Sequence, residues 1–214
     1  MQLENYCSQL ESRRLYASSR SNSIDKRLKV RGHRCYENSY PCIIVHGGAG
    51  DFNNDIIVEK MTGCKKAAIN GYKKLLDGQS SIEAVETALW WLECDEFYNC
   101  SYGSVLNERG QVQMDASLMD GLLFKCGSVA AVSDIEHPIS LAKYVLHNFP
   151  NALFVGDGAK NLAKYAGLNW ISEGNMVAPL ARLALKSSEG EEENDIDNLS
   201  LLGGDMLTSK VTGE

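Results

Sequence analysis

The chain has 214 residues, enough for one sizeable domain, and its apolar content of 44 % and charged content of 23 % are ordinary for a globular protein. Its net charge of −7 gives no sign of a nucleic acid or an anionic membrane as partner. No apolar run approaches the roughly 18 residues that a membrane-spanning helix needs, and the amino-terminal segment lacks the apolar core of a secretory signal.

The chain contains seven cysteines, an odd number with no CxxC pair and no zinc-type spacing. Without a secretory signal, reduced thiols are the simplest interpretation, and they predict a cytoplasmic protein. The residues concerned are Cys7, Cys35, Cys42, Cys64, Cys94, Cys100 and Cys126.

Residues 1–40 are rich in serine, arginine, lysine and asparagine and show little apolar periodicity. We interpret them as a disordered basic tail. The run Lys26–Arg34 is compatible with a nuclear address or a patch for an acidic partner, but a solvated tail is the favoured reading.

The folded part is predicted to begin at Pro41. The apolar run Cys42–Val45 is typical of a strand buried on both faces. It leads directly into His46-Gly-Gly-Ala-Gly50, where glycines would let backbone N–H groups approach a ligand or another chain segment closely.

Two helices are predicted to follow, joined by a tight turn. Gly78 suits the position just past the first helix, and Ser80 with Glu83 has the form of a capping box at the start of the second. The first helix is expected over residues 57–77, with an inward stripe of Ile57, Met61, Cys64, Ala68, Tyr72, Leu75 and Leu76. The inward stripe of the second is expected to be Ile82, Val85, Leu89 and Leu92.

A strand pair is predicted next, from Gly103–Leu106 and Gln111–Asp115, with a polar turn between them. The second strand would deliver an acidic, methionine-rich loop that ends at Gly121. Asp115 and Asp120 in this loop could act as a general acid/base pair. They could instead accept backbone N–H bonds and stabilise the turn, which is the favoured alternative.

The rest of the predicted fold alternates strands and helices. His137 precedes Pro138 and is expected at a helix start or on the surface. Strands are expected at Gly127–Val132 and Asn151–Val155, and helices at Pro138–Asn148, from Gly156 to Gly167 and at Val177–Ser187.

From Ser188 the composition becomes strongly acidic, and this segment is predicted to be a linker. Leu199–Glu214 follows it and is too short to form another layer of the fold. We therefore expect the chain to be incomplete. The predicted organisation is therefore a tail at 1–40, a domain at 41–187, and a linker with an unrelated tail at 188–214.

Common catalytic motifs are missing. The chain has no GxxxxGK[ST], no GxGxxG, no GxSxG and no HExxH, which argues against a phosphate loop, an α/β-hydrolase and a zinc hydrolase. The histidines His33, His46, His137 and His147 form no ligand-like cluster. The spacing of these residues in the sequence indicates a functional site, but it does not indicate which reaction the site catalyses.

Three motifs together give a resemblance: His46-Gly-Gly-Ala-Gly50, Asn99-x-x-x-Gly103-Ser-Val-Leu-Asn107 and Met114-Asp-Ala-Ser-Leu-Met-Asp-Gly121. They resemble the isoaspartyl peptidase/L-asparaginase family, the plant-type asparaginases among the N-terminal-nucleophile hydrolases. The resemblance implies an α/β fold that is part of a four-layer αββα sandwich. It also implies a precursor that cuts itself before a threonine into α and β chains.

In that family the new amino-terminal threonine is the nucleophile, and its own amine is the base. The threonine stands in a Thr-Val-Gly context, whereas Thr208 and Thr212, which follow the acidic linker here, have no Val-Gly after them. The chain thus resembles the α half alone and is expected to be catalytically incomplete. The resemblance implies a missing β chain, an (αβ)2 assembly and a small amide or isoaspartyl peptide as substrate.

By position, the resemblance assigns supporting roles to His46, Gly47, Gly48 and Asn99, and we expect Asp115 and Asp120 to complete a polar frame. It implies no organic cofactor but a possible structural sodium ion. The family's Asn-Ala-Gly is Asn99-Cys-Ser101 here, which would strain the loop if the glycine needs positive φ. The sodium would be held by the backbone carbonyls of Leu92, Glu93, Asp95, Tyr98, Cys100 and Tyr102.

Two alternatives stay open. The threonine aspartases, a protein-cleaving branch with the same fold, have a similar Asp-Ala-Ser-x-Met-Asp-Gly motif. The His-Gly-Gly and Gly-Ser-Val-Leu-Asn sequences of this chain are closer to the asparaginase branch. The chain could also be a non-catalytic truncated form that binds a full-length partner.

Overall fold

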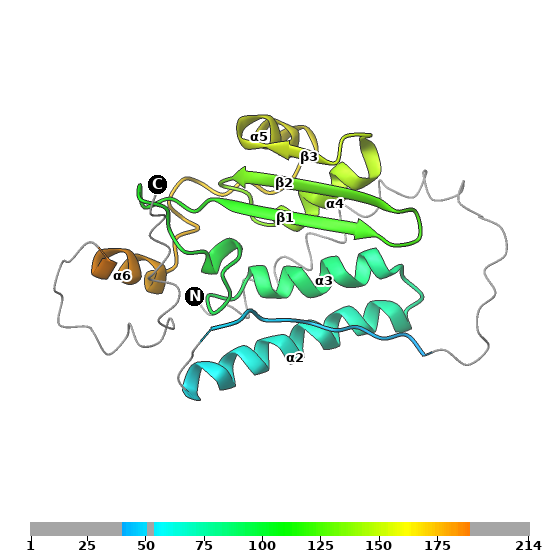
Figure 1. The fold of residues 1–214 in the computed structure, drawn as a ribbon, viewed down its shortest axis with the longest axis horizontal. Coiled ribbons are helices and arrows are strands. Elements are labelled where there is room, and N and C mark those ends of the chain that lie inside the picture. The colour runs from blue at the N-terminus through cyan, green and yellow to red at the C-terminus, as the bar shows by residue number, and fades with distance from the viewer. Residues whose placement is uncertain (1–39, 51–53, 189–214) are drawn as a thin grey trace, which may run out of the picture. The chain divides into compact units, whose positions relative to one another are not determined.

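The computed structural model of the chain describes residues 40–50 and 54–188 (Figure 1). Of the first unit, Met1–Cys42, it describes Tyr40–Cys42, which are exposed. Every helix and strand named below belongs to the second unit, Ile43–Glu214. Apart from Tyr40 and Ser188, the predicted tail and linker lie outside the described residues.

The helices and the later strands lie where the sequence pattern predicts them, with ends that differ by a few residues. The described elements are α2 (Asn54–Leu76), α3 (Ser81–Glu93), a short 3-10 helix η2 (Ser101–Gly103), β1 (Met114–Asp120), β2 (Lys125–Val132), α4 (Pro138–Asn148), β3 (Leu153–Val155), α5 (Gly156–Tyr165) and α6 (Pro179–Ser188).

Helices α2 and α3 pack side by side through small residues (Figure 1). Gly63, Ala67 and Gly71 form the buried stripe of α2, and a Cβ on Gly71 would come within 2.8 Å of the carbonyl oxygen of Ala84. The predicted stripe is therefore wrong in register, because Ile57 and Met61 are 43 % and 53 % exposed. Close approach of two helix backbones selects small side chains, which a search for large apolar residues overlooks.

The start of α3 confirms the hydroxyl half of the predicted capping box. Ser80 is the N-cap residue, and its Oγ accepts a hydrogen bond from the backbone N–H of Glu83 at 3.2 Å. The carboxylate of Glu83 reaches Lys143 on α4. Of the predicted inward residues of α3, Val85 is 37 % exposed, whereas Ile82 and Leu92 are buried.

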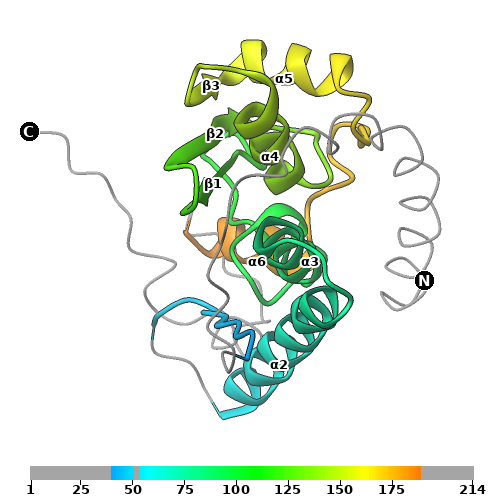
Figure 2. The same cartoon turned by 90° about the vertical axis from the view of Figure 1, so that its right-hand side faces the viewer.

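The strands form one sheet in the order β1-β2-β3, with β1 antiparallel and β3 parallel to β2. Helices α4 and α5 lie on the same side of it (Figure 2). A Cβ on Gly127 would meet the carbonyl oxygen of Ala142 at 2.3 Å, so α4 lies directly against β2. The buried core between these layers includes Val129, Val132, Leu141 and Val145.

The opposite face of the sheet is uncovered in the described structure. Met119 on β1 and Leu153 and Val155 on β3 are 53–59 % exposed. The strand register puts them on one face, because Met119 is paired with Cys126, Leu153 with Ser128 and Val155 with Ala130. One apolar face of this sheet is thus left without a layer.

Two predictions around residues 103–121 are wrong. Gly103–Leu106 is not a strand: Gly103 ends η2, and Leu106 makes a single bridge to Val112. The acidic stretch predicted as a loop is strand β1, because Met114 and Leu118 alternate inward with exposed residues between them. The composition of this stretch favours a loop, but its period of two decides the structure.

The structure confirms an α/β fold, but it does not contain the whole expected sandwich. The described residues form a single three-stranded sheet with helices on one face. A second sheet, which a four-layer αββα arrangement requires, is not formed within residues 40–50 and 54–188.

Candidate active-site frame

The segment Ile43–Gly47 is extended but unpaired. Ile43 and Val45 are partly buried against a core of α2 and α3, whereas Ile44 between them is 89 % exposed. The predicted strand at Cys42–Val45 is therefore not formed, although the alternation shows strand-like backbone. A strand needs a neighbour for its N–H and C=O groups, and the described residues provide none.

Gly47 brings the glycine-rich loop against Tyr98. A Cβ on Gly47 would lie 2.6 Å from Sγ of Cys64 and 3.0 Å from the ring of Tyr98. Distances below 3 Å are steric clashes, so no larger residue fits here without movement of its neighbours. The structure thereby brings the glycine-rich motif against Tyr98, the residue directly before the motif that begins at Asn99.

The neighbouring residues turn the chain sharply. Gly48 has a φ of 105°, a conformation that glycine accepts readily, and its N–H donates to Nδ1 of His46 at 3.2 Å. His46 is exposed. The loop thus places the backbone of Gly47 beside Tyr98, the residue before Asn99.

The side-chain amide of Asn99 is fixed by a hydrogen bond to its oxygen atom. Its Oδ1 accepts a hydrogen bond from the backbone N–H of Val105 at 3.0 Å, and the residue is exposed. Within the described part of the chain, Nδ2 has no partner, so the donor end of the amide is available. This arrangement suits a hydrogen bond to an oxygen atom supplied from outside the described structure.

Ser101 stands where the family's Asn-Ala-Gly has its glycine, and its φ shows whether this replacement strains the loop. It has a φ of 48°, so the position does require the left-handed conformation that favours glycine. The serine is 2 % exposed, and its Oγ donates to the carbonyl oxygen of Glu136 at 2.6 Å. A buried hydrogen bond therefore offsets part of the strain.

The six backbone carbonyls that the resemblance assigns to sodium stay a prediction, and the loop that carries them is packed around Gly103. The carbonyl oxygens of Asp95 and Tyr98 from that set converge on Gly103, and the third oxygen there is that of Glu96. Among the described residues, no group of three or more acidic, histidine or cysteine side chains could hold a metal ion. Four carbonyls of the set, those of Leu92, Asp95, Tyr98 and Cys100, accept backbone N–H bonds from Asp95, Tyr98, Cys100 and Gly103.

Asp115 and Asp120 stabilise the β1–β2 hairpin. Asp115 Oδ1 accepts from the N–H of Ala131 at 2.8 Å, across a β-bulge. Asp120 Oδ1 accepts from the N–H groups of Leu122 and Leu123 in the turn. These contacts support the structural alternative, and neither carboxylate hydrogen-bonds His46 or Asn99 in the described structure.

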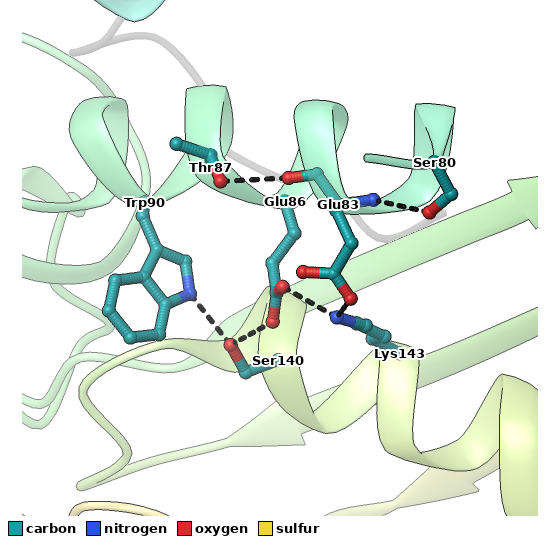
Figure 3. Close-up of polar contacts among 7 residues, drawn as sticks. All are labelled: Ser80, Glu83, Glu86, Thr87, Trp90, Ser140 and Lys143. Carbon is teal, nitrogen blue, oxygen red and sulfur yellow. Dashed lines mark hydrogen bonds and ion pairs between the residues drawn. The ribbon is translucent and has the colours of Figure 1, made fainter. Parts of the chain in front are cut away.

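Sequence reasoning missed a polar network between α3 and α4 (Figure 3). Ser140 donates to Glu86 Oε1 at 2.8 Å and accepts from the indole N–H of Trp90 at 2.7 Å. Lys143 donates to Glu86 Oε2 at 2.8 Å and contacts Glu83. The spacing of Glu83 and Glu86 along one face of α3 is the only signal that could have indicated it.

A second buried pair continues this interface. His137 begins α4 and is 6 % exposed, so the predicted helix start is confirmed and the surface alternative is wrong. Its Nδ1 lies 2.8 Å from Glu93 Oε2, and its ring stacks on Trp90 with centroids 3.9 Å apart. Glu93 Oε1 accepts from the N–H of Ile139 at 3.1 Å and thereby caps α4 from α3.

Burial dominates the ionisation of these groups. Desolvation raises the pKa of Glu93, and the hydrogen bond and charge of His137 act in the opposite direction. Burial, with the charges of Glu93 and Asp95, raises the pKa of the Cys100 thiol to about 12. Cys100 is therefore a thiol at neutral pH and is not a reactive nucleophile.

Comparison with known proteins places this frame in a family. A family model described as asparaginase matches residues 39–204. The chain therefore belongs to the asparaginase family, which confirms the resemblance.

Curated relatives agree. The chain is 37 % identical over 175 residues to the isoaspartyl peptidase/L-asparaginase of Homo sapiens, covering 79 % of this chain and 57 % of the relative. It is 35 % identical over 163 residues to that of Xenopus laevis (76 % and 53 %) and 33 % identical over 157 residues to that of Danio rerio (73 % and 51 %). The chain spans about half the length of these relatives.

None of the helices in the described residues combines the length and the apolar composition that a membrane-spanning helix requires.

Proposed function

We propose that this chain provides the non-nucleophilic half of a self-cleaving threonine hydrolase that acts on L-asparagine and on isoaspartyl peptide bonds. The observation that carries the proposal is the corner where Gly47 meets Tyr98 and the adjacent Asn99 presents a free amide N–H. The names of the relatives support the same substrates. His46, Gly48, Asp115 and Asp120 keep this corner and the hairpin in shape.

The nucleophile in this proposal belongs to a second chain segment. An amino-terminal threonine can deprotonate its own hydroxyl, because an α-amine has a pKa of about 8. The free amide N–H of Asn99 is suited to hold the oxygen of that threonine or of the substrate. The chain alone would therefore be inactive.

The surface of the described structure supports such a partner. The extended segment Ile43–Gly47 offers unpaired backbone groups, and Ile44 is 89 % exposed. The outer face of the sheet exposes Met119, Leu153 and Val155. Both features suit a β chain that adds strands and a second sheet, in an (αβ)2 assembly.

We propose the cytoplasm as the compartment. The cysteines of the described residues, Cys42, Cys64, Cys94, Cys100 and Cys126, are free thiols. Free thiols persist in a reducing environment.

Co-expression tests the proposal. The 214-residue chain would be produced with the second half of the human relative, beginning at its nucleophilic threonine, and assayed with L-asparagine and a β-aspartyl dipeptide. We expect hydrolysis by the pair and none by either half. Complex formation without turnover of either substrate would contradict the proposal. Cleavage of a protein after aspartate, without asparagine turnover, would indicate a threonine aspartase instead.

A further inference from the structure

The side chain of Tyr98 lies between two glycines that belong to different parts of the chain, and it is 3 % exposed. A Cβ on Gly47 of the glycine-rich loop would lie 3.0 Å from Cε1 of the ring. A Cβ on Gly63 of α2 would lie 2.9 Å from Cε2 and would overlap the hydroxyl oxygen. The two glycines therefore face opposite edges of one ring, and the ring fills the space between α2 and the glycine-rich loop.

The hydroxyl end of the ring is fixed on α2. The hydroxyl of Tyr98 donates a hydrogen bond to the carbonyl oxygen of Lys60, and Sγ of Cys64 lies 3.5 Å from the hydroxyl oxygen. Burial raises the pKa of this hydroxyl well above its ordinary value, so the group stays protonated and remains a donor. Nζ of Lys60 also donates to the carbonyl oxygen of Phe97, so α2 holds both residues that precede Asn99.

The backbone around Tyr98 fixes the position of Asn99. The N–H of Tyr98 donates to the carbonyl oxygen of Asp95 at 3.3 Å, and its own carbonyl oxygen accepts from the N–H of Cys100 at 2.7 Å. Oδ1 of Asn99 is bonded to the N–H of Val105 at 3.0 Å. Because its neighbours and its Oδ1 are held, the direction of the Asn99 Nδ2 depends on where Tyr98 sits.

One side chain thus connects the two segments of the candidate site. A shift of the Tyr98 ring would move Gly47, and with it the turn at Gly48, relative to Asn99. Catalysis is sensitive to such shifts, because a misplacement of about 1 Å can cost ~10²-fold in rate.

We propose that Tyr98 is a positioning residue of the candidate active site: its ring, held between Gly47 and Gly63, sets the place of the glycine-rich loop relative to Asn99. Its hydroxyl is bonded to α2, so Tyr98 acts through Asn99 and the loop and is not itself a catalytic group. The expected effect on turnover rests on the proposed function, whereas the packing of the ring is a property of the chain alone.

Hydrogen exchange on the 214-residue chain tests the packing without a second chain. Tyr98→Leu removes the ring, so the amide N–H groups of Gly48 and Val105 should exchange at least about 10-fold faster relative to the amides of α5. Tyr165→Leu removes an exposed tyrosine of α5 and should leave the exchange of Gly48 and Val105 unchanged. Wild-type exchange at Gly48 and Val105 in Tyr98→Leu would overturn the proposal.

Turnover by the chain co-expressed with the second half of the human relative tests the effect on the reaction. Tyr98→Leu should lower kcat by about 10²-fold and change KM by less than about 3-fold, since geometry and not binding is lost. Tyr165→Leu should leave both constants unchanged.

A second pair of variants serves if Tyr98→Leu does not fold. Gly63→Ala pushes the ring from the side of α2 and should lower kcat by about 10-fold. Adding Tyr98→Phe removes the hydroxyl oxygen that the new methyl group would overlap, and should restore part of that loss. Gly158→Ala adds a methyl group in open space inside α5 and should leave kcat unchanged.

The outcomes separate this inference from the proposed function. A wild-type pair without turnover would contradict the proposed function, and hydrogen exchange would then decide the role of Tyr98. An active pair in which Tyr98→Leu keeps the wild-type kcat, or in which Gly63→Ala and Tyr98→Phe lower kcat additively, would overturn the role of Tyr98 while the proposed function stands.

Discussion

At the scale of single residues, absent side chains decide the geometry of the candidate site. Gly47 and Gly63 both leave room for Tyr98, one from the glycine-rich loop and one from α2. A motif search finds the first of these glycines because it stands in a familiar string. The second has no such context, and only the packing shows its purpose.

Gly47→Ala should lower the free energy of unfolding by about 1–3 kcal/mol, because its methyl group would overlap Cys64 Sγ. Denaturant unfolding measures the change. Adding Cys64→Ala should recover part of the loss by removing the atom at 2.6 Å. Gly158→Ala is the control, since no atom lies within 4 Å of its added methyl group and it lies inside α5. An equal effect of both alanines would refute the packing argument.

Asn99→Ala should reduce kcat of the complemented enzyme by about 10²–10³-fold, because it removes one hydrogen-bond donor from the proposed reaction centre. Steady-state kinetics on a β-aspartyl dipeptide provide the measurement. Asn161→Ala changes an exposed asparagine of α5 and should leave kcat unchanged. A loss confined to KM would show that Asn99 only binds the substrate.

At the scale of elements, α3 is joined to α4 by charged groups as well as by apolar side chains of the shared core. Glu86, Glu93 and His137 are buried there, and every one of them has a partner on the facing helix. Buried charges are costly unless they are paired, so this interface fixes which faces of α3 and α4 meet. The pairing explains why α3 buries two faces, one toward α2 and one toward α4.

Stability should fall as the pH rises through the ionisation of Glu93. Burial raises the pKa of Glu93 in the folded chain above its unfolded value of about 4.3, so the folded state holds the proton more tightly. The stabilising contribution is present below about pH 4.3 and is lost as the pH rises through the folded-state pKa.

Glu93→Gln cannot ionise but keeps an acceptor for the N–H of Ile139, so it should flatten this part of the pH profile. Urea unfolding from about pH 4 to pH 7 measures the difference between the two proteins. Glu108→Gln, at a turn residue that is exposed, is the matched control. Parallel profiles for wild type and Glu93→Gln would show that another group causes the decline.

At the scale of the whole molecule, the sheet face that residues 40–50 and 54–188 leave uncovered is the dominant feature. Helices cover one side, and Met119, Leu153 and Val155 remain exposed on the other. Apolar surface of this kind is usually an interaction site, and it promotes association when the partner is missing.

The isolated chain should therefore bind an apolar dye and associate with increasing concentration. Met119→Ser with Leu153→Ser should reduce dye fluorescence while changing the unfolding free energy by no more than about 0.5 kcal/mol for each exposed residue. Tyr165→Ser removes an exposed aromatic side chain from α5, away from this face, and should not reduce dye binding. A monomeric chain without dye binding would contradict this prediction.

The sequence by itself determined the helices and the family. Apolar residues at helical spacing locate α2, α3 and α4, and Gly156 and Gly167 bracket α5. The three motifs at 46–50, 99–107 and 114–121 together indicate the asparaginase family, which the family model over residues 39–204 confirms. These signals are local, and local physics suffices to read them.

Only the tertiary structure decided which groups the predicted site residues contact. It showed that Asp115 and Asp120 make hairpin contacts, and that Cys42–Val45 has no strand neighbour within the described residues. It also brought Gly47 to Tyr98 and Lys60 to Phe97. Each of these outcomes depends on atoms that are distant in the chain. A strand needs a partner strand, a carboxylate accepts from an N–H that the fold brings near, and the purpose of Gly63 appears only where the Tyr98 side chain packs against it.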